Sequence, residues 1–130
     1  MGTGFKGNAD HFHSVTENIG KMEELYDYHN GLFGERGQSR SETIRNIASD
    51  DPAKTAKEFY DTLAHGGIEK ELLYPDGTLK GFQTIMADGT IINWRLVSSS
   101  SDKSPAVDID VQYSDESGNL ISQKIHFVQE

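Results

Sequence analysis

Four residues in the last third of the chain carry side chains that together can act on a phosphodiester: Arg95, Asp108, Lys124 and His126. Each lies in a segment where apolar and polar residues alternate, the pattern of a strand with one buried and one exposed face. The apolar set of each segment should be buried, so all four side chains are expected on the exposed face. Neighbouring strands lie about 4.8 Å apart, and pairing in sequence order would gather the four in one cleft.

The chemistry that these groups support is cleavage of RNA. A histidine with a pKa near neutrality serves as general base or acid, and Arg95 or Lys124 would stabilise the extra charge of a pentacoordinate phosphate. Asp108 would orient His126 or pair with Arg95. The 2′-hydroxyl of RNA is an internal nucleophile, so the reaction needs neither a metal nor a cofactor. Hydroxyls can hold phosphate oxygens, and the predicted substrate-binding residues are Ser98, Ser99, Ser100 and Thr84.

Each of these signals also has a purely structural interpretation. His126 on an exposed strand face can simply be solvated, and Arg95 with Asp108 can be a cross-strand ion pair worth about 0.2–1 kcal/mol. The serines at 98–101, followed by Asp-Lys, are typical of a flexible loop.

Two further patterns are weak candidates for metal binding. His11 and His13 have no nearby cysteine and no clear third ligand, although either could be a second acid–base group. Asp108 and Asp110 could hold Mg²⁺, but alternate carboxylates on a strand are also ordinary solubilising charges. We therefore predict no metal site.

The elements that must position these residues begin with helices. Apolar residues at spacings of three and four predict a helix over residues 12–28, and the glycine-containing segment 29–38 is predicted to be a loop. Ser39 followed by Glu42 has capping-box spacing, which predicts a short helix. The residues expected on the buried side of that helix are Ile44, Ile47 and Ala48.

The segment after residue 50 has the strongest helix signals. Asp51 is a good N-cap and Pro52 suits the first helical position. The pair Gly66-Gly67 ends the helix, because glycine readily adopts the left-handed conformation found there. The expected buried stripe consists of Ala53, Ala56, Phe59, Tyr60, Leu63 and Ala64.

Strands follow these helices. Asp76-Gly77 and Asp88-Gly89 each lie between apolar segments, a strong hairpin signal. The strands expected around the site are residues 90–97, 106–113 and 120–128. Their apolar residues expected to face the helices are Ile92, Trp94, Leu96, Val107, Ile109, Val111, Tyr113, Ile121, Ile125 and Phe127. This order predicts an α+β fold in which N-terminal helices pack on one face of a C-terminal antiparallel sheet.

Length and composition restrict the classes of protein. The chain has 130 residues, and we expect a glycine-rich linker remnant at 1–10 and a single, monomeric domain over 11–130. Cysteine is absent, which excludes disulfides and thiolate zinc sites, and no apolar run approaches transmembrane length. The net charge of −9 argues against general coating of nucleic acid duplexes. It allows a locally positive cleft or a basic partner protein.

Several strings carry a resemblance to a known family. They are Gly81-Phe82-Gln83-Thr84, Met86-Ala87-Asp88-Gly89-Thr90, Ser104-Pro105-Ala106-Val107-Asp108-Ile109 and Gln123-Lys124-Ile125-His126-Phe127-Val128. With Arg95, the serine run and Asp50-Asp51-Pro52, they cover roughly residues 40–128. This region resembles the C-terminal toxin domains of bacterial polymorphic toxins, carried on delivery proteins of the contact-dependent-inhibition, WapA/Rhs and LXG types. A related toxin group has a basic-Ser-Thr…Pro-x-x-Asp string, of which the half at residues 105–108 is present.

The resemblance implies a fold and an activity. Many such domains are ribonucleases of the barnase–EndoU–colicin–RelE-like fold, in which N-terminal helices precede an antiparallel sheet whose face carries the site. It implies metal-independent cleavage of RNA, often tRNA, and neutralisation by a cognate immunity protein. It also implies a toxin secreted or displayed as the C-terminus of a larger protein and active in the cytoplasm of the target cell.

Two other functions remain open at this point. A metal-dependent DNase toxin would use Asp108 and Asp110. A non-catalytic, acidic protein of the immunity type would use its negative charge to meet a basic toxin.

Overall fold

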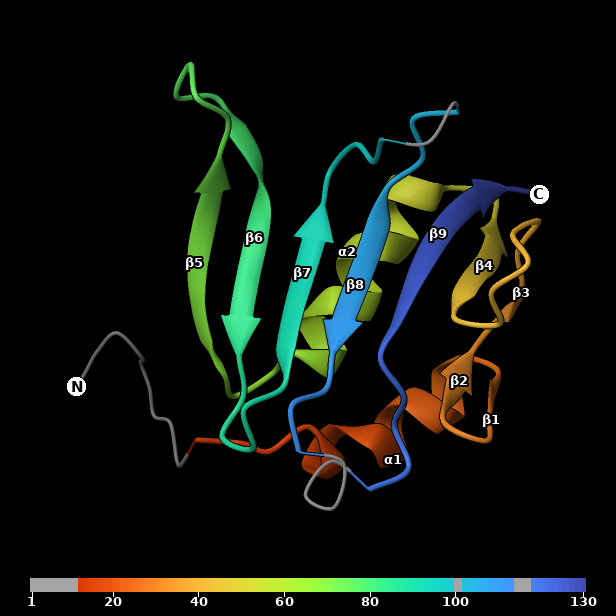
Figure 1. Ribbon diagram of the computed structural model, residues 1–130, viewed down its shortest axis with the longest axis vertical. Helices are drawn as coiled ribbons and strands as arrows, with labels where there is room; N and C mark the ends of the chain where they lie inside the picture. Colours follow the sequence, from red (N-terminus) through yellow and green to blue (C-terminus); the bar gives the residue numbers. More distant parts are fainter. Residues whose placement is uncertain (1–11, 100–101, 114–117) are drawn as a thin grey trace.

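The computed structural model describes residues 12–99, 102–113 and 118–130 (Figure 1). It has the predicted α+β fold, with two helices packed against a large sheet. The predicted linker at 1–10 and His11 lie outside the described residues. The elements are α1 (Thr16–Leu25), β1 (Tyr28–His29), β2 (Leu32–Phe33), β3 (Glu35–Arg36), β4 (Ile44–Ser49), α2 (Pro52–Leu63), β5 (Ile68–Leu73), β6 (Leu79–Ile85), β7 (Ile91–Arg95), β8 (Ala106–Asp110) and β9 (Gln123–Gln129).

Seven strands form one sheet in the order β3-β4-β9-β8-β7-β6-β5. From β5 to β9 each strand pairs antiparallel with the next, so β7, β8 and β9 are neighbours in sequence order, as predicted. The C-terminal strands thus form the predicted antiparallel sheet, and β4, which runs parallel to β9, makes the whole sheet mixed. Parallel neighbours require a crossover connection, and the chain from α2 to β8 provides it.

Helix α2 forms for the reasons that its sequence indicates. A carboxylate oxygen of Asp51 accepts a hydrogen bond from the Lys54 backbone N–H at 3.3 Å, and Pro52 is the first helical residue. The chain leaves the helix through Gly66, whose φ of 83° lies in the left-handed region. The predicted buried stripe is confirmed except at Ala53, which is exposed.

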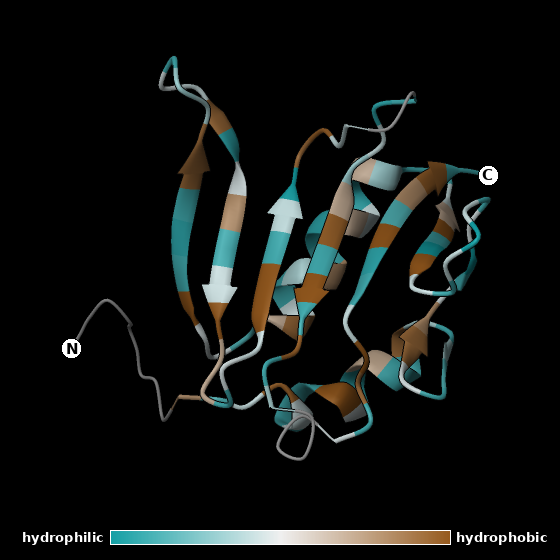
Figure 2. Cartoon of the chain, in the orientation of Figure 1, coloured by the Kyte–Doolittle hydropathy of each residue, from teal (hydrophilic) through white to brown (hydrophobic). Residues whose placement is uncertain are grey.

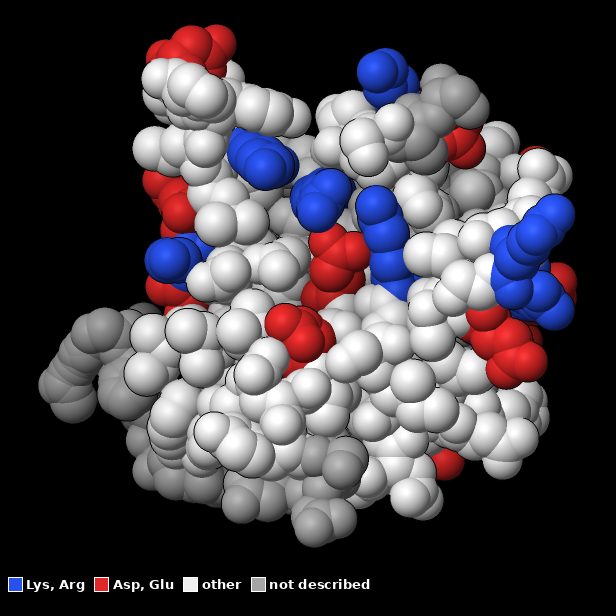
Figure 3. Space-filling view, in the orientation of Figure 1, with Lys and Arg blue, Asp and Glu red and all other residues white. Residues whose placement is uncertain are grey.

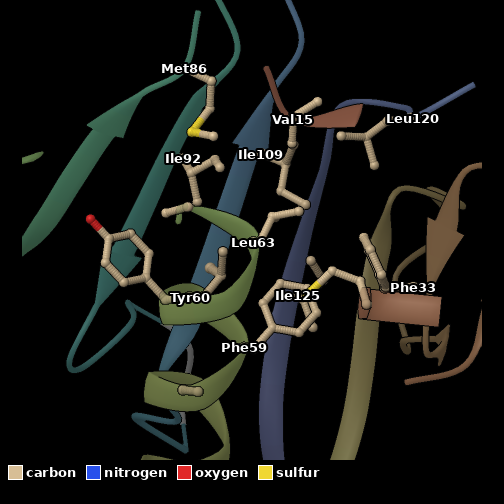
Figure 4. Close-up of a cluster of buried hydrophobic side chains, with 14 of the residues drawn as sticks. Val15, Phe33, Phe59, Tyr60, Leu63, Met86, Ile92, Ile109, Leu120 and Ile125 are labelled. Carbon is tan, nitrogen blue, oxygen red and sulfur yellow. The ribbon is translucent and has the colours of Figure 1, made fainter. Parts of the chain in front are cut away.

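The main core lies between α2 and the sheet (Figure 4). Phe59 is fully buried and contacts three other rings: Tyr26 at a centroid distance of 5.0 Å, Phe33 at 5.0 Å and Phe127 at 5.3 Å. The sheet contributes fully or almost fully buried residues, namely Ile92, Val107, Ile109, Ile125 and Phe127. Phe59 therefore joins α2 to the end of α1, to β2 and to β9.

Helix α1 is shorter than the predicted span of 12–28 and crosses the sheet near one end, below the strands in Figure 1. Its buried Asn18 side chain donates hydrogen bonds of 2.8 Å to the carbonyl oxygens of Leu63 and His65. These carbonyls lie at the C-terminal end of α2, where a helix leaves acceptors without intrahelical partners. Asn18 therefore connects α1 to α2 and satisfies those acceptors.

The predicted loop at 29–38 contains short strands instead. The β1–β2 hairpin turns at Asn30 and Gly31, which both have positive φ, 54° and 83°. Asn-Gly between two strands is the preferred sequence of such a two-residue turn, so a local signal for this hairpin was present.

The predicted short helix after Ser39 was also wrong. Ile44, Ile47 and Ala48 belong to strand β4, which lies between β3 and β9. Pairing with two neighbouring strands satisfies the backbone of this segment, and such tertiary pairing overrides weak local helix signals.

Strand alternation is visible as brown and teal bands along β8 (Figure 2). Tyr113 and Ile121 were predicted to face the helices, but they are 61% and 40% exposed. Both lie outside the paired strands, since β8 ends at Asp110 and β9 begins at Gln123. Alternation predicts orientation only within a paired strand.

Neither described helix is long and apolar enough to pass through a lipid bilayer.

The burial of Phe59 among three rings predicts the effect of one substitution. Phe59→Ala should lower the free energy of unfolding by about 3–5 kcal/mol, because it leaves a cavity among three rings. Chemical denaturation followed by circular dichroism measures this change. Lys54→Ala, on the exposed side of α2, is the control and should change the free energy by no more than about 0.5 kcal/mol. Equal effects of the two substitutions would contradict the assignment of Phe59 to the core.

Candidate functional site

All four predicted catalytic residues lie on the sheet face opposite α2, which we call the open face. Ile92, Val107 and Ile125 are fully buried in the core beneath the helices, so their neighbours along each strand point the other way. In Figure 1 α2 lies behind the sheet, and no described helix lies in front of β5–β9.

The strand register places the four residues in two adjacent rows. Arg95 and His126 are both partners of Ala106, one on each side. Asp108 and Lys124 are direct partners in the next row. The backbones of Arg95 and His126 are thus two strand spacings apart, about 10 Å, a distance that long side chains on one face can bridge.

Arg95 forms an ion pair with Asp108, with 3.1 Å between its Nε and a carboxylate oxygen. The two side chains are 33% and 21% exposed, so solvent screens the pair and its contribution to stability is at most about 1 kcal/mol. The register partners of Arg95 are Gly81 and Ala106. A Cβ at Gly81 would overlap the carbonyl oxygen of Trp94. Position 81, beside Arg95, therefore requires glycine.

His126 is half-buried, and its Nδ1 lies 3.3 Å from the hydroxyl of Ser104. Burial lowers the pKa of His126 below its ordinary value of 6.5, and the positive charges of Lys124 and Arg95 lower the pKa further. Asp102 and Asp108 oppose this effect. The imidazole is therefore mainly neutral at pH 7 and can accept a proton.

Charges of both signs gather in the middle of the open face (Figure 3). Arg95 and Lys124 face one carboxylate, Asp108, within the two rows. Asp110 lies one row further along, opposite Ile91. Asp102 also acts on His126, so two carboxylates match the two cations and the cluster is close to neutral on a chain whose formal net charge is −9.

Thr84, predicted to bind substrate, lies on the wrong face for that role. It is 1% exposed and its hydroxyl is hydrogen-bonded to the hydroxyl of Tyr60 in α2. Thr84 is the register partner of the buried Ile92, so it faces the helices and cannot touch a ligand on the open face.

The serine run does not form one exposed set of hydroxyls. Ser98 is 3% exposed, and its backbone N–H donates to the carbonyl oxygen of Ser104 at 2.9 Å. Ser99 is exposed, whereas Ser100 lies outside the described residues. The backbone hydrogen bond between Ser98 and Ser104 lies near His126, since the Ser104 hydroxyl meets the imidazole.

Sequence reasoning missed Ser104 as a neighbour of the site. The 7% exposed side chain of Ser104 meets His126, which is 22 residues further along the chain. Its position before Pro105 predicts an extended backbone but carries no information on this partner. The Asn93 and Gln83 side chains on the open face were also missed as a pair.

His13 lies at the junction of the two helices. Its backbone N–H donates to Gly66 at 3.0 Å, and its ring meets that of His65 edge-on at 5.1 Å. Its Nδ1 is 3.2 Å from the amide oxygen of Asn18. Within the part of the chain that the structure describes, no group of three or more His, Asp or Glu side chains is placed to hold a metal ion.

A separate hollow of about 640 Å³ lies beside β3, β4 and the C-terminal end of α1. The carboxylates on its lining belong to Asp27, Glu35, Asp50 and Glu130, and no Lys or Arg is among the described lining residues. A phosphodiester would be repelled there, so the open face is the better candidate for binding an anion.

We compared the chain with known proteins in three ways. No family model, curated protein or solved structure matches it. The proposal below therefore depends on the open face and on the resemblance described above.

The burial and charged neighbours of His126 predict how it titrates. Its pKa, measured by NMR, should lie below 6.5. Lys124→Ala should raise this pKa by removing a positive charge, and Asp102→Ala should lower it by removing a negative one. A pKa at or above 6.5, or shifts of the opposite sign, would contradict the electrostatics described here.

The same shift has a consequence for stability. Above about pH 6.5 the His126 imidazole is neutral in both the folded and the unfolded state, and burying it costs no stability. As the pH falls through the lowered pKa of the folded state, the unfolded chain binds the proton more tightly than the folded chain does. The free energy of unfolding therefore decreases over this pH range.

Proposed function

We propose that this domain is a metal-independent endoribonuclease that cleaves RNA through the 2′-hydroxyl. The observation that carries the proposal is the row that contains His126, with its lowered pKa, and Arg95, on a sheet face that no described helix covers. A neutral general base beside fixed positive charge is the minimum that this reaction requires.

Each residue has a distinct role in the proposed reaction. The neutral His126 accepts the proton of the 2′-hydroxyl, and the 2′-oxygen attacks the adjacent phosphorus. Arg95 and Lys124 stabilise the negative charge that develops on the phosphoryl oxygens. The bond to the 5′-oxygen breaks, and this oxygen leaves with a proton from Lys124 or from water. The products are a 2′,3′-cyclic phosphate and a 5′-hydroxyl.

Two further residues would position these groups. Asp108 restricts the orientation of the Arg95 guanidinium through the 3.1 Å ion pair. Ser104 holds the imidazole through Nδ1, which leaves Nε2 as the atom available to a substrate. Neither residue needs to exchange a proton during the reaction.

The biological setting that we propose follows from the sequence resemblance. The domain would act as an antibacterial effector that is secreted or displayed as the C-terminus of a larger protein and reaches the cytoplasm of a target cell. A cognate immunity protein would neutralise it, and tRNA is the first substrate to examine. The formal net charge of −9 suggests that an immunity protein would approach with a basic surface.

The proposal predicts that the purified protein cleaves total RNA equally well with and without EDTA. His126→Ala should lower the rate by about 10²–10⁴-fold, the typical contribution of a general base. Gel electrophoresis follows the cleavage, and end analysis should find cyclic phosphates.

His29→Ala is the matched control, because His29 is exposed on the small β1–β2 hairpin. It should leave the rate unchanged. RNA that stays intact with the wild-type protein would overturn the proposed function, and full activity of His126→Ala would remove that residue from the mechanism. If the wild-type protein cleaves RNA without EDTA but not with EDTA, the result would instead favour a metal-dependent nuclease.

The toxin assignment makes a separate prediction in cells. Expression of the wild-type domain in the bacterial cytoplasm should arrest growth, and His126→Ala expressed to the same level should not. A harmless wild-type domain would argue against a toxin and favour an acidic protein of the immunity type.

A further inference from the structure

The open face also carries a pair of amide side chains beside the proposed catalytic rows. Gln83 of β6 and Asn93 of β7 are register partners. The Gln83 Nε2 donates a hydrogen bond of 2.9 Å to the Asn93 Oδ1. Both side chains are half-buried, so the pair forms part of the floor of this face.

The pair leaves a defined set of hydrogen-bonding atoms. One amide hydrogen bond occupies one N–H and one oxygen, and neither side chain has another such bond in the described part of the chain. The Gln83 oxygen thus remains an acceptor, and the Asn93 amino group remains a donor. Reversing both amides would still leave one acceptor and one donor side by side, so this complement does not depend on how the amides are assigned.

An apolar surface lies directly beside the amides. Ile85 and Ile91 are the next residues on the same side of β6 and β7, and they are register partners of each other. Ile85 is 42% exposed and Ile91 is half-buried. A flat ring packed on these two side chains would present its edge to Gln83 and Asn93.

The amides are also continuous with the proposed catalytic rows. Asn93 is the register partner of Asp108, which is in turn the partner of Lys124. One strand spacing, about 4.8 Å, separates the amide pair from the carboxylate that holds Arg95. The base of a nucleotide whose phosphate lies near Arg95 would reach this part of the sheet.

We propose that Gln83, Asn93, Ile85 and Ile91 form a nucleobase subsite that determines which nucleotide flanks the cleaved bond. RNA bases differ in the order of the groups on their Watson–Crick edge: A and C place an amino donor beside a ring-nitrogen acceptor, and G and U place a carbonyl acceptor beside a ring N–H donor. With the phosphate near Arg95 and the ring on the isoleucines, one of these two orders meets the acceptor and the donor of the amide pair and the other does not. This inference depends on the proposed ribonuclease function for its biological meaning, but base binding itself can be measured without catalysis.

The first experiment measures binding with the His126→Ala protein. AMP, GMP, CMP and UMP are titrated separately, with ribose 5-phosphate as the ligand that lacks a base. At least one nucleotide should shift the side-chain NH₂ signals of Gln83 and Asn93 in ¹H–¹⁵N NMR spectra, whereas ribose 5-phosphate should not. Equal responses to all five ligands, or none at these amides, would overturn the subsite.

The second experiment measures base preference in cleavage. Wild-type protein is given dinucleotides that differ only in one base, and the ratio of kcat/KM between the best and worst base is determined. Asn93→Ala should reduce this ratio by roughly 5- to 150-fold, the discrimination expected of a paired base contact. A merely structural amide pair would change kcat/KM for all bases alike and leave the ratio unchanged, which would also overturn the subsite.

Control variants separate the possible outcomes. Gln38→Ala removes an exposed amide in the segment before β4 and should not alter the ratio. Gln83→Ala tests the same pair if Asn93→Ala fails to fold. Base-dependent binding together with RNA that the wild-type protein leaves intact would retain the subsite and reject the nuclease. Cleavage with no base preference would retain the nuclease and reject the subsite.

Discussion

The rest of the structure depends on one constraint: which side chains of β7, β8 and β9 face the helices and which face the open side of the sheet. α2 packs on Ile92, Ile109 and Ile125, and burial of each such side chain contributes about 1.5–3 kcal/mol. A slip of one residue would exchange the two faces of a strand. It would expose these apolar groups and bury the side chains of Arg95 and Asp108, at a cost of several kcal/mol for each desolvated ion. The core thereby determines which groups are displayed.

This fixed orientation of the strands also explains the electrostatics of the charged cluster around His126. Because Arg95 and His126 share a row with Ala106 between them, the guanidinium acts on the imidazole without a bulky side chain intervening. The positive charges that would bind a phosphate are the same ones that help keep the His126 pKa low. The proposed anion binding and the neutral imidazole would therefore be two consequences of one arrangement.

Sequence reasoning succeeded for α2, where several local signals agree, and failed for β4, where distant contacts decide; it also missed the β1–β2 hairpin, although its Asn-Gly turn is a local signal. α2 was predicted because its cap, its first proline and its apolar stripe all lie within a few residues of one another. β4 was mistaken for a helix because its stability comes from β3 and β9, which no pattern within the segment reveals. Thr84 was assigned to substrate binding without regard to strand phase, and its neighbour in the sheet, Ile92, shows that it faces the core.

Period-two alternation needs only adjacent residues, so the chain's own pattern was sufficient to put Arg95, Asp108, Lys124 and His126 on one side of their strands. Partner choice and register join residues far apart in sequence, and they follow from packing and backbone pairing across the whole sheet. Folding alone therefore decided that Ser104 meets His126, that Gln83 meets Asn93 and that β4 lies beside β9. The Gln83–Asn93 contact depends on the register of one hairpin, and the other two depend on longer chain closures and on the fit of the core, which no short stretch of residues specifies.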